Sequence, residues 1–500
     1  MKYLFFLLLT LNFSLIFAQE VFVKTITDVP INAMASANDL KVCPDSGYII
    51  TGLNFDTNNG AYLIKTNSVG DTLWTRRYPL IQAGLKVFMS CSGEYVSIGE
   101  NSFVKVDSLG SANMIRSYYD ISIVTASQTN DCGYMLAGST QSFGAGGFDI
   151  LLIRADSSGL PTLCNSFGGN GNDYVNSIFH TSDDNYLLTG FSESFSSNTD
   201  SYIIKIDSNG NIIWSKTYAS DNCKVSSATE AQNGNYVFLA PSDSGTILFE
   251  TDTAGNLNWS KSFRPTISGY SLNRSLDGGY IFTTGINYPE KIEYIKTDIS
   301  GNLQWNFSAG GENEYNYGTC FMQSADSGYV LLFYGSGNHF QRSSFGFLKT
   351  NLFGMLNCGD VSNTITVTPV SMQVAPVNSV SSSQTATYQN QSLGSNSMSI
   401  SIATFCSTVD IENPNQINRS SIAPSISSSK NLKLEILSDA ILNDVLVSVF
   451  DINGHTILTQ KVSGNKNEVL ISIRQTLMPG MYFIRLLQKN KVEVIKFIII

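Results

Sequence analysis

The chain has little charge, few histidines and no paired cysteine motif. Only 14% of its 500 residues are charged, and 30 basic against 40 acidic side chains give a net charge of −10. The low charge argues against a coiled coil and against disorder driven by charge, and the acidic balance argues against a nucleic-acid partner. The three histidines lie far apart and no CxxC occurs, so the sequence predicts neither a metal site nor a cofactor.

Long apolar segments are also absent, except at the N-terminus. There Lys2 precedes the apolar run Tyr3–Phe17, and Ala18 offers a small residue for cleavage before Gln19. The run is shorter than the ~20 residues of a membrane-spanning helix, so residues 1–18 are predicted to be a cleaved signal peptide. We therefore expect an exported protein whose eight cysteines meet an oxidising compartment, with their pairing left open.

The chain is rich instead in a repeat that contains tyrosine, glycine and serine. Each of seven units opens with a tyrosine and carries a turn glycine further on. The tyrosines are Tyr48, Tyr95, Tyr134, Tyr186, Tyr236, Tyr280 and Tyr329, and the glycines are Gly70, Gly110, Gly159, Gly210, Gly255, Gly301 and Gly354. This period and the β-branched runs are typical of four-stranded propeller blades. The predicted fold class is therefore all-β, with a seven-bladed β-propeller over residues 19–360.

The fourth unit shows how four strands fit into one repeat. Gly210 is expected in the tight turn before the last strand, where a positive φ is needed. The strands are expected at Val175–Thr181, Tyr186–Gly190, Ser201–Ile206 and Asn211–Tyr218. The seventh unit lacks a convincing fourth strand, and residues 19–28 have a similar pattern. We expect this segment to close the ring as the outermost strand of the last blade.

Loop lengths indicate which side of the propeller binds ligands. The connection between the second and third strands varies most, and it shares a face with the connection to the next blade. Such variation is expected where a protein binds its partners. The candidate binding residues on this face are Asp149, Asp173, Tyr174, Asp200, Glu312 and Tyr315. The alternative is structural, with acids at strand entries or turns and tyrosines packed at the rim.

A cation lies five residues before the turn glycine in six units, and an acid or asparagine lies two residues after that cation. In the fourth unit these residues are Lys205 and Asp207. Because residues i and i+2 share a strand face, the spacing predicts one exposed ion pair per blade. Asp207, Asn209 and Asn211 also fit a calcium loop in part, but a turn in which Asp207 caps its own backbone is favoured.

The chain after residue 360 changes in composition. Residues 361–410 are rich in Ser, Thr and Val and predict a β-rich connector with one or two strands. A linker rich in Pro, Asn and Ser is predicted at 411–430. Residues 431–500 alternate apolar and polar positions in short runs separated by turns, which predicts a small Ig-like β-sandwich.

This last segment carries a set of short motifs, whose residues are Asp451, Gly454, Pro479, Gly480, Tyr482, Lys496 and Phe497. In combination they resemble the type A C-terminal sorting domain of the type nine secretion system of Bacteroidota, although the usual Pro-Asn-Pro entry motif is absent. The resemblance implies that the outer-membrane secretion machinery is a partner. It also implies a protein that is secreted or held on the cell surface, at the exterior of the outer membrane.

Three functions fit these observations. The first is non-enzymatic binding of an extracellular glycan or protein through the variable face. The second is a hydrolase or lyase that acts on extracellular polysaccharide with carboxylates on the same face, and the third is a purely structural surface component. No nucleophile motif occurs and no spacing pairs two acids, which favours binding without catalysis.

Overall fold

A computed structural model describes most of the chain beyond its N-terminal segment. The described residues are 21–28, 35–54, 60–78, 83–266, 268–287, 290–309, 315–336, 344–356, 364–390, 396–397, 400–407, 421–426, 432–442, 445–451, 456–462, 466–473, 480–488 and 491–499. Within these ranges every regular element is a β-strand and none is a helix. The expected all-β class is therefore confirmed, whereas the predicted signal peptide at 1–18 lies outside the described residues.

Up to residue 407, the described strands form seven antiparallel sheets of four or five strands. The first strands of these sheets are β2 (Ala35–Val42), β6 (Lys86–Met89), β10 (Ser122–Gln128), β14 (Asp173–His180), β18 (Ser227–Glu230), β22 (Leu272–Arg274) and β26 (Tyr315–Gln323). The second strands, each beginning at a repeat tyrosine, are β3 (Tyr48–Asn54), β7 (Tyr95–Gly99), β11 (Tyr134–Thr140), β15 (Tyr186–Ser192), β19 (Tyr236–Ser242), β23 (Tyr280–Asn287) and β27 (Tyr329–Ser336).

The outer half of each sheet completes the repeat. The third strands are β4 (Gly60–Thr66), β8 (Ser102–Val106), β12 (Asp149–Ala155), β16 (Asp200–Ile206), β20 (Gly245–Thr251), β24 (Glu290–Thr297) and β28 (Ser344–Thr350). The fourth strands are β5 (Thr72–Tyr78), β9 (Ala112–Tyr118), β13 (Pro161–Gly168), β17 (Ile212–Ala219), β21 (Leu257–Arg264), β25 (Leu303–Ala309) and, from the N-terminal end, β1 (Phe22–Asp28).

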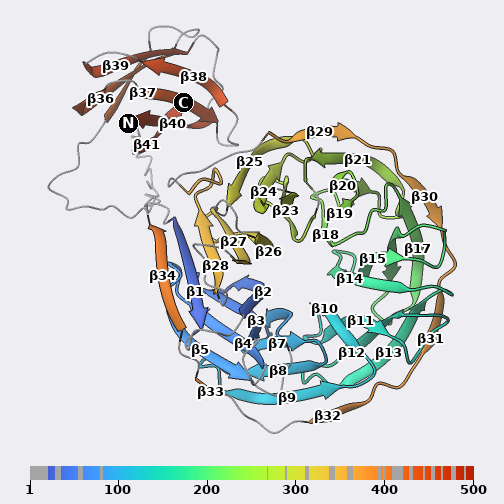
Figure 1. Ribbon diagram of the computed structural model, residues 1–500. Helices are drawn as coiled ribbons and strands as arrows, with labels where there is room; N and C mark the ends of the chain where they lie inside the picture. Colours follow the sequence, from blue (N-terminus) through green and yellow to red (C-terminus); the bar gives the residue numbers. More distant parts are fainter. Residues whose placement is uncertain are drawn as a thin grey trace, which may run out of the picture.

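The sheets are arranged in a ring, with the first strands at the centre (Figure 1). Neighbouring first strands contact each other around the circle, and β26 contacts β2, which joins the last sheet to the first. This arrangement is a β-propeller, as the repeat predicted. The apolar core lies between adjacent sheets: Met135 and Ile150 of one sheet, for example, pack in one cluster with Val175 and Ile204 of the next.

The N-terminal strand β1 lies within the sheet that begins with β26. It pairs antiparallel with β28, so that Phe22 lies opposite Lys349. Its other edge pairs with β34 (Ile400–Ser407), where Thr25 lies opposite Ala403. β1 therefore takes the fourth-strand position, but the expectation that it is the outermost strand of its sheet is wrong.

A belt of short strands surrounds the ring on its outer side (Figure 1). The belt consists of β29 (Thr366–Pro369), β30 (Gln373–Pro376), β31 (Val380–Ser383), β32 (Tyr388–Asn390), β33 (Asn396–Ser397) and β34. These strands pair in turn with β21, β17, β13, β9, β5 and β1, so the chain returns around the ring in the reverse order. The sequence predicted one or two strands in this connector, but six of the seven sheets gain a fifth strand from it.

Each turn glycine packs against a tryptophan of the preceding sheet where that sheet has one. A Cβ built on Gly255 would lie 3.1 Å from the ring of Trp214, and one built on Gly301 would lie 2.7 Å from Trp259. The Trp214 indole also donates a hydrogen bond of 3.1 Å to the carbonyl of Thr253. Because Gly255 has φ of +77°, only glycine meets both demands of this turn without strain.

The cation of the repeat has a different partner from the one predicted. Lys205 Nζ lies 2.6 Å from Asp183 Oδ2, in the turn between the first two strands of its sheet. Asp207 instead accepts backbone N–H bonds from Asn209 and Asn211 in its own turn, at 2.9 and 2.8 Å. The lysine reaches across the neighbouring strand because both turns lie at the same end of the sheet. The predicted ion pair with Asp207 is wrong, and the predicted cap is confirmed.

The same pairing recurs around the ring, with cations that are largely buried. The pairs are Lys65–Asp45, Lys105–Glu94, Arg154–Asp131, Lys205–Asp183, Lys296–Asp277 and Lys349–Asp326. The side chain of Lys205 is 6% exposed, against 47% for Asp183. These are therefore half-buried ion pairs and not the exposed pairs that the sequence predicted.

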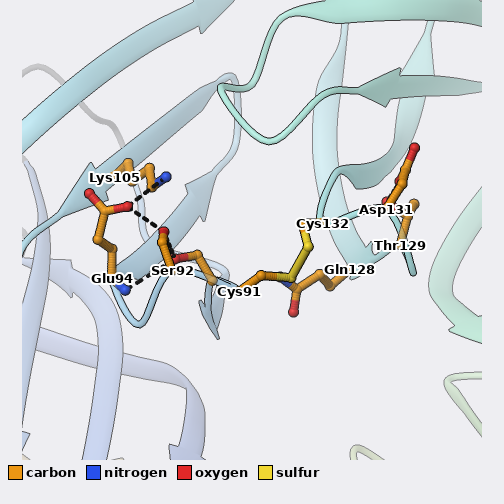
Figure 2. Close-up of a disulfide and its surroundings, with 9 residues drawn as sticks. Cys91, Ser92, Glu94, Lys105, Gln128, Thr129, Asp131 and Cys132 are labelled. Carbon is orange, nitrogen blue, oxygen red and sulfur yellow. Dashed lines mark hydrogen bonds and ion pairs between the residues drawn. A yellow bond between two sulfur atoms is a disulfide. The ribbon is translucent and has the colours of Figure 1, made fainter.

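One disulfide joins two adjacent sheets at their short turns. Cys91 lies between β6 and β7, and Cys132 lies between β10 and β11, with 5.8 Å between their Cα atoms. Figure 2 shows the bond beside Glu94, which accepts hydrogen bonds from Ser92 and Lys105. Four other cysteines, Cys43, Cys164, Cys223 and Cys320, are buried free thiols.

The C-terminal segment forms two further sheets. One has the order β35 (Ser421–Ile426), β36 (Leu432–Leu442) and β39 (Lys466–Ile473); the other has the order β38 (Thr456–Val462), β37 (Val445–Asp451), β40 (Gly480–Gln488) and β41 (Lys491–Ile499). β35 falls inside the predicted linker at 411–430 and pairs with β36, so part of that segment is a strand.

The motif residues of this segment come together on its second sheet. Asp451 lies opposite Tyr482, which in turn lies opposite Phe497, and Lys496 lies opposite Phe483. Gly480 is the first residue of β40. Gly454 and Pro479 lie outside the described residues.

Candidate functional site

The two faces of the ring differ in the connections that they carry. We call the side with the connections from second to third strands, and from each sheet to the next, the loop face. The side with the short turns is the turn face. Among the described connections of the loop face, 141–148, 169–172, 193–199 and 220–226 lie close together in sequence around the β10–β13 and β14–β17 sheets. The predicted residues Asp149, Asp173 and Asp200 begin strands at this part of the loop face, and Tyr174 directly follows Asp173.

Asp149 and Asp173 are buried side by side beneath these loops. Asp149 is 1% exposed and Asp173 is 0% exposed. A Cβ built on Gly168 would lie 1.9 Å from Asp149 Oδ1 and 2.7 Å from Asp173 Oδ2, so both carboxylates approach the same glycine. Burial raises the pKa of Asp149, the backbone N–H of Gly146 opposes the rise, and the charge of Asp173 adds to it. Two acids of like charge therefore share a site that is closed to solvent.

Each of the two carboxylates holds a glycine-rich loop with one of its oxygens. Asp149 Oδ2 accepts hydrogen bonds from the N–H groups of Ala145 and Gly146, at 3.1 and 3.4 Å. Asp173 Oδ2 accepts bonds from the Gly169 N–H at 2.7 Å and from Ser194 Oγ at 2.6 Å. The Oδ1 atom of each carboxylate is buried without a hydrogen-bond partner. The acids thus order the loops, and their burial is unfavourable for direct contact with a substrate.

Three aromatic rings form a row next to these acids in the chain. Phe148 precedes Asp149, Tyr174 follows Asp173, and Phe191 lies opposite Tyr174 on β15. The ring centroids of Phe148 and Tyr174 are 5.4 Å apart, and those of Tyr174 and Phe191 are 5.0 Å apart. Each of the three side chains is partly exposed. We call Phe148, Tyr174 and Phe191 the aromatic row.

Polar groups border the aromatic row. Lys224 Nζ lies 4.6 Å from the centroid of the Phe191 ring, a cation–π contact at one end of the row. Asn172 accepts a bond from the Phe148 N–H at 3.0 Å and donates one of 2.8 Å to the exposed carboxylate of Glu193. Burial, and then the charge of Glu193, raise the pKa of Tyr174. Flat apolar rings beside hydrogen-bonding groups are suited to ligands that have both apolar faces and hydroxyl groups.

The other predicted binding residues do not join this group. Asp200 begins β16 and is 7% exposed. Tyr315 is the first residue of β26, in a different sheet, and Glu312 lies outside the described residues. Phe148, Phe191 and Lys224 are not among the candidate residues predicted from the sequence, because they come from three separate connections and strands. The variation in loop length nevertheless places the segments 143–149 and 191–200, which contain Phe148 and Phe191, on the loop face.

A cavity lies on the axis of the ring. A cavity of 330 Å³ is lined by residues from all seven first strands, and its charged groups are Asp39, Lys41 and Lys86. Asp39 Oδ2 accepts a bond of 3.0 Å from the Val87 N–H and lies 3.9 Å from Lys41 Nζ. His180, at the end of β14, pairs with Asp184 in the adjacent turn at 2.9 Å and stacks on Tyr186. Asp39, Lys41 and His180 are thus engaged in contacts within the fold.

In the residues that the structure describes, no group of three or more His, Cys, Asp or Glu side chains is placed to hold a metal ion. In the same residues, no helix has the length and apolar character of a membrane span.

The C-terminal segment can be compared with a known family. Residues 428–500 match the secretion system C-terminal sorting domain. The match implies that the chain is exported and is therefore a secreted or cell-surface protein. It covers the last two sheets apart from β35, and it agrees with the resemblance carried by the sequence motifs.

Comparison of the whole fold gives distant similarities. A catalytically inactive virginiamycin B lyase from Staphylococcus aureus with quinupristin is 13% identical, with 66% of this chain and 99% of that chain covered and a TM-score of 0.46. The polysaccharide lyase Uly1 is 9% identical (63% and 90% covered, TM-score 0.40), and extracellular domains 1–2 of Drosophila Semaphorin 1a are 8% identical (67% and 88% covered, TM-score 0.41). Similarity at this level assigns no activity to this chain. No curated protein matches the sequence.

Proposed function

We propose that this protein is a secreted or surface-displayed seven-bladed β-propeller that binds an extracellular glycan through the aromatic row, without catalysis. Its signal peptide starts export, and its Ig-like C-terminal sandwich directs the chain through the type nine secretion system of a member of the Bacteroidota. Sorting machinery at the outer membrane is then one partner, and the glycan is the other.

The observation that carries the binding proposal is the aromatic row itself. Sugar rings have apolar faces that stack on aromatic rings and hydroxyl groups that bond to amides and carboxylates. Phe148, Tyr174 and Phe191 supply the rings, and Asn172 and Glu193 supply the polar groups. The row lies on the face where the loops vary, at two adjacent sheets that hold it in place.

The burial of the acids weighs against the alternative, a polysaccharide hydrolase or lyase. A catalytic carboxylate must touch the bond that it breaks. Asp149 and Asp173 are closed to solvent and hold loop backbone, so neither is placed for that role. A protein ligand on the same row stays an outcome of the binding test.

Binding is tested with the full secreted chain on a polysaccharide and oligosaccharide array. Tyr174→Ala and Phe191→Ala are expected to weaken capture at least about tenfold, since each removes a ring from the row. Tyr119→Ala is the control, because Tyr119 is an exposed aromatic of the loop face, 45% exposed, outside the row. Equal capture by all three variants would contradict the proposal, and release of shorter products would show an enzyme.

The sorting role is tested by deleting residues 428–500. The truncated protein is expected to stay inside the outer membrane, whereas the full chain reaches the cell surface or the medium. Its normal appearance outside the cell would contradict the role. This outcome is independent of glycan binding, since the deletion leaves the ring and the aromatic row intact.

A further inference from the structure

Two carboxylate oxygens on the loop face are buried without a partner. They are the Oδ1 atoms of Asp149 and Asp173, whose side chains are 1% and 0% exposed. A buried oxygen that carries charge destabilises a fold unless something compensates it, and a second acid beside it increases the cost. Three backbone N–H groups donate hydrogen bonds to these acids, and all three donate to Oδ2 atoms. The two Oδ1 atoms are therefore left for another group.

The next interface around the ring, between the β14–β17 and β18–β21 sheets, has only one acid at the equivalent positions. Asp200 begins β16 as Asp149 begins β12, and both are buried. Cys223 lies 13 residues before the repeat tyrosine Tyr236, as Asp173 lies 13 residues before Tyr186. Burial chiefly raises the pKa of Cys223, and the charge of Asp200 adds to the rise, so these two groups are also neighbours. One interface thus pairs an acid with a neutral thiol, and the other pairs an acid with an acid.

We propose that the carboxylate oxygens without a partner at this acid pair hold a single divalent cation of the calcium class between Asp149 and Asp173. Carboxylate oxygens are the ligands that calcium prefers, and its flexible coordination accepts carbonyl oxygens from the glycine-rich loops 144–148 and 169–172 as well. The cation neutralises the two charges where no water can reach them. This site departs from the sequence expectation, which found no metal motif because its two acids come from different repeats.

The site explains the glycines in the two loops and at the end of β13. Gly168 leaves room for both carboxylates, and a Cβ on Gly144 would lie 2.1 Å from Asp149 Oδ2. Gly169 donates its N–H to Asp173. A cation here would tie the loop before β12 to the loop before β14 and so fix Phe148 and Tyr174, its neighbours in the chain. This last consequence rests on the proposed function, whereas the cation site itself does not.

The ion is tested on the full secreted chain with calcium and terbium as probes, in the absence of any glycan. After treatment with EGTA, added Ca²⁺ is expected to raise the Tm by several degrees, because it binds the folded state alone. Tb³⁺ is expected to luminesce on excitation of tyrosine, since Tyr174 adjoins Asp173 and Tyr202 lies within the field of both acids. Both effects should saturate at one ion per chain.

Isosteric variants decide between the possible reasons for a response. Asp149→Asn and Asp173→Asn keep the shape of the site and each remove one charge. In each variant Ca²⁺ is expected to leave the Tm unchanged, and the Tb³⁺ luminescence is expected to be about tenfold weaker than in the wild type. Asp200→Asn is the matched control and should respond like the wild type. A wild type without any Ca²⁺ or Tb³⁺ response would overturn the site, and so would an equal response in all three variants. A Tm that falls with rising pH and ignores Ca²⁺ would show a shared proton instead and overturn it as well.

Discussion

At the scale of single residues, the cation found in six of the seven repeats is the clearest departure from sequence expectation. Lys205 lies on the third strand of its sheet, but its ion-pair partner Asp183 lies in the turn between the first two strands. The same arrangement is found for Lys65, Lys296 and Lys349. A cation that is nearly closed to solvent requires its acid, because the desolvation of an unpaired ammonium group is costly. Each pair therefore joins the first turn of a sheet to its third strand.

We expect Asp183→Asn to lower the free energy of unfolding by about 1–2 kcal/mol at pH 7, less than for a fully buried pair because Asp183 is half exposed. Burial raises the pKa of Asp183, but hydrogen bonds from Lys205 and Thr181 outweigh it and lower the pKa to about 2. A lowered folded pKa gives stability that is present above the unfolded pKa of about 3.9 and is lost as pH falls through about 2.

The difference in the free energy of unfolding between wild type and Asp183→Asn should therefore become smaller as pH is lowered from about 4 to about 2. Urea unfolding at a series of pH values measures this difference. Asp184→Asn serves as the control, because Asp184 is 59% exposed and contacts His180 at the surface. A constant difference across this pH range would show that the ion pair is not its source.

At the scale of elements, the disulfide acts between sheets and not within one. Cys91 and Cys132 come from the corresponding turns of two adjacent sheets, 41 residues apart. We expect the free energy of unfolding of the double variant Cys91→Ser/Cys132→Ser to be about 2–4 kcal/mol lower than that of the wild type, mainly because the unfolded chain is no longer constrained. Thermal unfolding with and without reductant measures the effect. Reductant should lower the Tm of the wild type to that of the variant and leave the variant unchanged; a further drop in the variant would point to another cause.

The elements also show how far the sequence alone could lead. Tyrosines at the start of second strands and glycines in turns lie at fixed positions, because local sterics determine them, and the all-β propeller followed from them. The partner of Lys205 and the approach of Phe148 to Tyr174 could not be predicted, since both depend on the register of strands that are not neighbours in sequence. Asp149 and Asp173 were identified as loop-face residues, but their burial became visible only with the loops in place.

At the scale of the whole molecule, the belt determines which edges of the propeller are open. The ring alone would present the outer edges of its fourth strands, and unpaired edges of this kind promote association with other chains. The belt strands cover six of them, and Ser215 and Ser260 fix the belt by donating hydrogen bonds of 2.7 and 2.5 Å to the carbonyls of Val377 and Val370. The sequence did not show the belt, because five of its six strands have only two to four residues and no repeat, and such strands give no periodic signal.

The belt makes the position of the chain end decisive for solubility. A chain that ends after residue 407 keeps all six belt strands, and a chain that ends after residue 363 keeps none. We expect the longer chain to retain the Tm and oligomeric state of the full protein, since only the sorting segment is lost. The shorter chain should unfold at a lower temperature and form larger assemblies, because β1, β5, β9, β13, β17 and β21 then present free edges. Light scattering during size-exclusion chromatography compares the two, and equal behaviour would mean that the ring is stable without its belt.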